Sequence, residues 1–247
     1  MSGHSKWATI KRKKGAIDAK RGKIFTKLIK EISIAARLGG GEVDNNPRLR
    51  LAVQNAKGQN MPKDNIERAI KKATGADATE YFEVTFEGYG PNGVAVFVEC
   101  TTDNNNRAVS NVRAIFSKYG GSLGTNGSLE FIFSRKGNFS ILKPAGMDED
   151  EFMLEIIDAG AEDAEVDEDY INVTCDMTDF GSIQKKLDEM GIEVEEAELQ
   201  RVPNTTVSLD DEAFQKVMKL IDALEDNDDV QKVFHNIEVS DAQMDLV

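Results

Sequence analysis

Apolar residues in the first third of the chain recur at steps of three and four, which is the spacing of amphipathic helices. Glycine and proline divide this part into segments. Gly39–Gly41 ends the first run, and Pro47 suits the first position of the next helix. The pattern predicts three short helices that pack as a small bundle. They run over residues 16–38, from Pro47 to the break at Gly58–Met61, and from Pro62 or Asp64 until Gly75 closes the third.

After residue 78 apolar and polar positions alternate, which is typical of half-buried strands. Phe82, Val84 and Phe86 share one face of the first strand, and a glycine-rich connection follows them. A helical period then returns before a further strand. The order is ββαβ, with strands expected at 81–87, 93–101 and 129–133 and a helix at 105–119.

Residues 137–203 form a self-contained pattern of four strands and two helices. The strands are expected at 139–142, 164–166, 170–175 and 192–202, and the helices at 148–159 and 180–190. Their order, βαββαβ, is the split βαβ motif of ferredoxin-like domains.

The end of the chain adds a helix at 210–224 and a strand at 230–239, which can complete the earlier sheet. The ferredoxin-like unit is then an insertion. We predict an α+β fold, with an N-terminal three-helix bundle followed by two α/β domains of the ferredoxin-like type. The expected domains are 1–75 (basic arm and helical bundle), 79–135 plus 205–240 (middle α/β domain) and 136–204 (inserted acidic ferredoxin-like domain).

Charge is distributed unevenly along the chain. The net charge of the 247 residues is −14, which by itself argues against a nucleic-acid partner. Residues 1–75, however, contain 18 basic and 6 acidic residues, a net charge of +12, whereas the remainder has 12 basic and 38 acidic residues, a net charge of −26. Such asymmetry indicates a nucleic-acid or other anionic partner for the basic part.

The densest cationic run lies in the first thirty residues. Residues 1–15 have little periodic apolar content and are predicted to form an arm. Four lysines of the following helix are spaced as one stripe, and cations in a line bind phosphates through counterion release. An aromatic ring among them can stack on an unpaired base. The predicted nucleic-acid-binding residues here are Lys6, Trp7, Lys11, Arg12, Lys13, Lys14, Lys20, Arg21, Lys23, Lys27 and Lys30.

Two other interpretations of this run are a solvated basic face without a partner and a membrane surface. The membrane interpretation competes with the bundle, which requires Ile24, Phe25 and Leu28 for its core.

A second basic set lies on the second and third helices and gives them the outline of a helix-turn-helix protein. A solvated surface is the alternative, and no base can be assigned. The set consists of Arg48, Arg50, Lys57, Lys63, Arg68, Lys71 and Lys72, of which Arg48, Arg50 and Lys63 are predicted to contact nucleic acid.

Two polar segments have less specific patterns. GGSLGTNG at 120–127 lacks the Lys-Ser/Thr ending of a phosphate-binding loop and precedes a strand, so a plain connection is favoured. TTDNNNR at 101–107 joins a strand to a helix and fits either a binding loop or a helix N-cap.

No catalytic or metal-ligand pattern is apparent, so we predict a protein that is not an enzyme and has no cofactor or metal. The carboxylates are too numerous for any pair to stand out, and the two histidines are too far apart for zinc. Cys100 and Cys175 lie in apolar runs without CxxC spacing, which favours buried free thiols over a disulfide. With no secretory or membrane-spanning segment, the expected location is the cytoplasm, without a membrane or small-molecule partner.

A set of motifs, taken together, resembles the YebC family. They are GHSKWATIKRKKG, FTKLIKEI, NPRLR, NMPKDNIERAIKK, EGYGPNGVA, TDNNNR and GGSLGTNGSLEFIF, which follow in order through residues 3–134. The acidic remainder is similar more loosely, and Ala8-Thr9 stands where Ala-Asn is common. The resemblance implies a helical bundle and two α/β domains, one of them inserted, and assigns the arm and bundle to nucleic acid.

The resemblance leaves two functions open. Family members are labelled probable DNA-binding transcriptional regulators, whereas others act on ribosomes as translation factors that relieve difficult stretches of synthesis. The label favours DNA. The net charge of −26 after residue 75 favours the ribosome slightly, because an acidic body is repelled by a duplex. A loosely ordered basic arm also suits irregular RNA, whose bases are unstacked.

Overall fold

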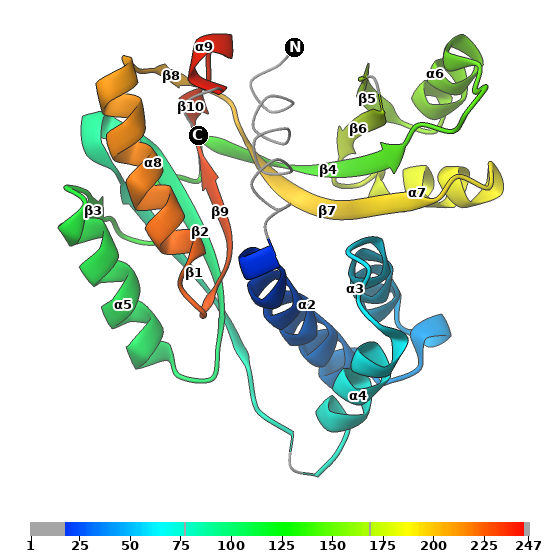
Figure 1. The fold of residues 1–247 in the computed structure, drawn as a ribbon, viewed down its shortest axis with the longest axis horizontal. Coiled ribbons are helices and arrows are strands. Elements are labelled where there is room, and N and C mark those ends of the chain that lie inside the picture. Colours follow the sequence, from blue (N-terminus) through cyan, green and yellow to red (C-terminus); the bar gives the residue numbers. More distant parts are fainter. Residues whose placement is uncertain (1–17, 77, 168, 245–247) are drawn as a thin grey trace. The chain divides into compact units, whose positions relative to one another are not determined.

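The structure is a computed structural model that describes residues 18–76, 78–167 and 169–244 (Figure 1). Two compact units are present. The first comprises residues up to Lys30, 78–134 and those from 202 onward, and the second comprises 31–77 and 135–201. The predicted fold class, with N-terminal helices followed by antiparallel sheets, is confirmed. The predicted boundaries of three domains stay a prediction.

The N-terminal helices follow the apolar periodicity. They are α2 (Asp18–Gly39), α3 (Pro47–Gly58) and α4 (Lys63–Ala73), with a short 3-10 turn η1 (Val43–Asn45) before α3. Pro47 occupies the start of α3 as expected. Asn46 caps it, because its side chain accepts the N–H of Leu49 and donates to the carbonyls of Ala35 and Gly40. One buried amide thus joins the end of α2 to the start of α3.

Helix α3 also packs on the ferredoxin-like part of the second unit. Leu51 contacts the apolar core of that part. The side-chain amide of Asn55 exchanges two hydrogen bonds with the backbone of Ala197, at 2.9 and 3.0 Å, as a neighbouring strand would. Gln54 and Gln184 are joined at 2.7 Å. The second unit is therefore held together by polar as well as apolar contacts.

Gly58 marks the closest approach in this packing. A Cβ built there would lie 2.0 Å from the backbone oxygen of Glu195, which cannot rotate away. We expect Gly58→Ala to lower the free energy of unfolding by about 1–3 kcal/mol, as overpacking does. Gly22→Ala is the matched control, because a Cβ at Gly22 meets nothing within 4 Å and alanine favours a helix. Urea unfolding should move in opposite directions for the two variants, and a shared direction would contradict this account.

The first unit is built on a four-stranded sheet with the order β3-β1-β2-β9. Its elements are β1 (Phe82–Tyr89), the 3-10 turn η2 (Pro91–Gly93), β2 (Ala95–Thr102), α5 (Asn105–Lys118), β3 (Ser122–Leu123), α8 (Asp211–Glu225) and β9 (Val230–His235). β9 pairs antiparallel with β2, so a segment from the end of the chain completes this sheet. A small parallel pair, β8 (Val207–Ser208) with β10 (Ile237–Glu238), and the short helix α9 (Asp241–Met244) follow.

Both faces of this sheet are covered. Val96, Val98 and Cys100 of β2 pack against α5 and α8, which lie on the same face (Figure 1). On the opposite face, Phe97 packs with Leu129 and Phe133. Strand β2 is therefore buried on both sides, which explains its continuous apolar run.

The strand predicted at 129–133 is wrong. Residues 127–132 form turns, and the next strand, β4 (Phe133–Leu142), begins only at Phe133 and joins the other sheet. The carboxylate of Glu87 accepts the backbone N–H groups of Gly127 and Leu129, at 2.7 and 2.6 Å. These bonds hold the segment in turns and direct Leu129 into the core. Apolar periodicity cannot reveal such a contact over forty residues.

The second sheet has the order β5-β6-β4-β7, and the pattern βαββαβ is confirmed. After β4 come α6 (Glu149–Asp158), β5 (Ala161–Val166), β6 (Tyr170–Asp176), α7 (Phe180–Glu189) and β7 (Val194–Pro203). Phe139, Phe152, Ile156 and Ile183 are among its buried core residues.

The two cysteines are buried free thiols, as expected. Burial raises the pKa of Cys100 to about 12 and that of Cys175 to about 11, so neither is a thiolate at neutral pH. Within the described part of the chain, no helix is long and apolar enough to span a membrane.

Candidate nucleic-acid interface

Most of the predicted nucleic-acid-binding residues of the arm precede the described part of the chain. Lys6, Trp7, Lys11, Arg12, Lys13 and Lys14 lie outside the described residues. Lys20 and Arg21 belong to the first turns of α2, and their side chains also lie outside the described part. The roles of all eight residues therefore stay predictions.

The next two lysines of the predicted stripe lie against the C-terminal end of α8. Lys23 Nζ is 2.8 Å from a carboxylate oxygen of Asp226 and 3.2 Å from its carbonyl oxygen. Lys27 Nζ donates to the carbonyl of Glu225 at 3.0 Å. The last carbonyls of a helix lack partners within it and carry partial negative charge, which the lysines satisfy. The sequence shows the spacing of this stripe but not its intramolecular partner.

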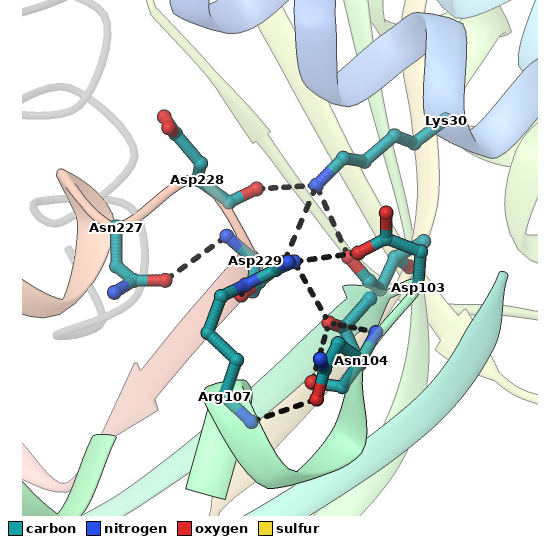
Figure 2. Close-up of polar contacts among 9 residues, drawn as sticks. Lys30, Asp103, Asn104, Arg107, Asn227, Asp228 and Asp229 are labelled. Carbon is teal, nitrogen blue, oxygen red and sulfur yellow. Dashed lines mark hydrogen bonds and ion pairs between the residues drawn. The ribbon is translucent and has the colours of Figure 1, made fainter. Parts of the chain in front are cut away.

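Lys30 reaches from α2 into a polar cluster at the end of β2 (Figure 2). Its ammonium donates to the carbonyls of Thr101, at 3.1 Å, and Asp228, and lies 3.9 Å from the Asp229 carboxylate. The ring of Tyr81 lies 5.9 Å away. Lys30 is 9% exposed, so its charge is neutralised inside the first unit. The phosphate contact predicted for Lys30 stays a prediction. The contacts described above join α2 to other segments of the first unit.

Arg107 completes the cluster from the first turn of α5. Its guanidinium binds both carboxylate oxygens of Asp229, at 3.0 and 2.7 Å, and one oxygen of Asp103 at 2.6 Å. The Asp229 side chain is 4% exposed. Figure 2 shows these side chains converging from α5, the end of β2 and the turn before β9. Because a bidentate pair is geometrically specific, the cluster sets where these three segments meet.

The protonation states of this cluster reinforce one another. Burial opposes the charge of Asp229, but hydrogen bonds from Arg107 and Thr102 outweigh it and hold the pKa of that carboxyl below its ordinary value. The hydrogen bonds to Asp229 and Asp103 raise the pKa of Arg107 above its usual value. Two cations face two carboxylates, so the cluster offers no excess positive charge to a phosphate.

The TTDNNNR segment supplies much of this cluster. Asn104 accepts the N–H of Arg107 at 3.0 Å and caps α5, which is one of the two alternatives that the sequence left open for this segment. Asp229 was not predicted as a site residue. It lies in an acidic turn where the sequence contains no signal that separates it from its neighbours, and its partner Arg107 is 122 residues away.

The second basic set forms the outward surface of α3 and α4 in the second unit. The buried residues of α4 are Ile66, Ala69 and Ala73, so its cations face solvent. Lys63 makes an exposed ion pair with Glu67 at 3.4 Å, and Arg50 donates to the Asp44 carbonyl. The seven exposed cations are Arg48, Arg50, Lys57, Lys63, Arg68, Lys71 and Lys72. Their contact with nucleic acid stays a prediction.

Comparison with known proteins identifies the family. The family model for the TACO1/YebC N-terminal domain matches residues 5–76, and the model for the TACO1/YebC second and third domains matches residues 81–237. This chain belongs to the TACO1/YebC family. A relative from Amoebophilus asiaticus is 56% identical over 96% of this chain and 98% of its own length. A relative from Geotalea uraniireducens is 52% identical over 99% of both chains. Both are named probable transcriptional regulatory proteins.

The fold is shared with a solved TACO1/YebC relative. The crystal structure of a conserved hypothetical protein from Aquifex aeolicus is 43% identical, with a TM-score of 0.81 over 91% of this chain and 93% of that one. Among the described residues of this TACO1/YebC protein, no group of three or more His, Cys, Asp and Glu side chains is placed to hold a metal ion.

Proposed function

We propose that this TACO1/YebC protein is a non-enzymatic regulator of gene expression that binds nucleic acid through its basic N-terminal part. The observation that carries the proposal is the partition of charge, +12 in residues 1–75 against −26 in the rest. The exposed cations of α3 and α4 are consistent with it. Since Lys23, Lys27 and Lys30 are engaged inside the first unit, we assign the main phosphate contacts to the arm and to Arg48, Arg50 and Lys63.

The first candidate target is DNA, with the protein acting as a transcriptional regulator. The names of the relatives support this choice. On DNA the acidic body would be repelled by the phosphates and would face away from the duplex.

The second candidate is a translation factor that binds ribosomal RNA. The net charge of −26 after residue 75 favours it, because an acidic surface is compatible with the basic proteins of a ribosome. Both candidates require the same basic residues, so variants of these residues cannot separate them.

A density-gradient profile of native lysate separates the two. The protein is followed with an antibody, before and after RNase or DNase treatment in parallel samples. If it acts on DNA, it should sediment with chromosomal DNA and be released by DNase alone. Sedimentation with ribosomal particles that RNase abolishes would instead establish the translation factor. Sedimentation as a free protein in every sample, at low salt, would refute both.

A further inference from the structure

A groove with a volume of about 820 Å³ runs between the outer edge of β1 and helix α5 in the first unit. Asn105, from the TTDNNNR segment, lines it. Ser122, Gly124 and Asn126, from the GGSLGTNG segment, also line it. The two polar segments that flank helix α5 therefore meet at one surface. The groove contains none of the residues assigned above to nucleic acid.

The edge of β1 beside this groove is largely uncovered. Strand β3 pairs with Gly88 and Tyr89, the end of the eight-residue β1. The Glu87 carbonyl accepts the N–H of Gly124 at 2.8 Å, so it points away from β2. Because backbone groups alternate along a strand, those of Thr85 point to the same side. No strand among the described residues pairs with Thr85 there, which leaves an open edge that another strand can join.

The side chains of the groove favour a peptide over a nucleic acid. They are mainly amides, hydroxyls and apolar groups, and the two charged side chains in the lining are Glu83 and Arg113. Their charges cancel, and residues 76–247 carry a net charge of −26, so a chain of phosphates is repelled. Arg113 is exposed and has no ion pair with any described residue, so it complements an acidic side chain.

We propose that this groove binds an extended segment of another polypeptide, which adds as a strand beside β1 and places an acidic side chain at Arg113. Main-chain hydrogen bonds to the edge at Thr85 supply affinity, as in other cases of strand addition. The side-chain amides of Asn105 and Asn126, which line the groove, can bond to peptide groups of the added strand. Arg113 supplies the preference for an acidic residue.

The proposal is tested with two pools of capped pentapeptides, randomised except for a central Glu in one pool and a central Lys in the other. Immobilised full-length protein is exposed to each pool, and retained peptides are quantified by mass spectrometry. The Glu pool should be enriched about twofold to fivefold over the Lys pool. Arg113→Glu should reverse this preference, whereas Arg135→Glu, an equal charge change on β4, should not.

The most enriched peptide is then titrated into the ¹⁵N-labelled protein. The backbone amide of Thr85 and the side-chain amides of Asn105 and Asn126 should shift, and N-methylation of alternate peptide bonds in the peptide should abolish the shifts. Three results would overturn the proposal. They are equal enrichment by the wild type and Arg113→Glu, the same shifts with an RNA oligonucleotide, and shifts that depend on protein concentration without peptide, which would indicate a second copy. Arg113→Glu should keep its nucleic-acid affinity, so failure here is distinct from failure of the proposed function.

Discussion

Replacing Lys11, Arg12, Lys13 and Lys14 together with alanine should weaken nucleic-acid binding by about a hundredfold to a thousandfold at roughly 0.1 M salt. Each phosphate contact that is lost removes the release of about one counterion. For a duplex, the slope of log affinity against log salt should therefore become shallower by about 3–4. Fluorescence anisotropy with a labelled duplex and a labelled RNA, over a salt series, measures both quantities. The melting temperature should not change, because these four residues are cations in a segment with little apolar content.

A charge-matched control tests whether position matters beyond net charge. Replacing Lys118, Lys185, Lys216 and Lys219 with alanine removes the same four charges from exposed positions of the two α/β parts. This variant should keep the wild-type salt slope. Equal losses of nucleic-acid affinity in the two variants would show that binding follows overall charge alone. A large fall in the melting temperature of the arm variant would show that these residues belong to the folded core.

Removing the carboxylate of Asp229 should destabilise the first unit more than any other single change considered for it. Asp229→Ala leaves Lys30 buried without a carboxylate and deprives Arg107 of its bidentate partner. Breaking a buried ion pair by removing one partner costs about 3–5 kcal/mol. Because Arg107 is half-exposed and regains water, we expect the lower end, a fall in melting temperature of roughly 6–12 °C for a protein of this size. Thermal unfolding followed by circular dichroism measures it.

Asp103→Ala is the matched control for this prediction. Asp103 also pairs with Arg107, but its side chain is 46% exposed, and exposed pairs contribute about 0–1 kcal/mol. If both variants melt at the same temperature, the buried cluster is not what stabilises this part of the protein.

The effect of Asp229 should also depend on pH. The folded-state pKa of this carboxyl is lowered, so its stabilisation is present above the unfolded-state pKa of about 3.9 and is lost as pH falls through the folded pKa. The difference in stability between the wild type and Asp229→Ala should therefore be constant near neutral pH and shrink below about pH 4. A difference that stays constant as pH falls well below about 4 would exclude the ionised carboxylate as its source.

The local pattern of apolar and polar residues was sufficient to predict the elements whose structure depends on residues close in sequence. The helices α2, α3 and α4 lie where apolar residues recur at steps of three and four, and Pro47 begins α3 as its fixed backbone angle requires. The βαββαβ order of residues 133–203 was predictable for the same reason. The strand expected at 129–133 failed because the Glu87 carboxylate, forty residues earlier, holds that segment in turns.

The candidate interface shows the same division between local and distant effects. The sequence by itself determined the spacing of the lysine stripe, the partition of charge and the polar character of the TTDNNNR and GGSLGTNG segments. Only the tertiary structure decided that Lys23, Lys27 and Lys30 bind carbonyls at the end of α8 and in the turn after it, and that the two polar segments share a groove. The reason is physical. Periodicity records which face of an element is apolar, whereas the partner of a charged side chain depends on which distant segment folding brings within about 4 Å of it.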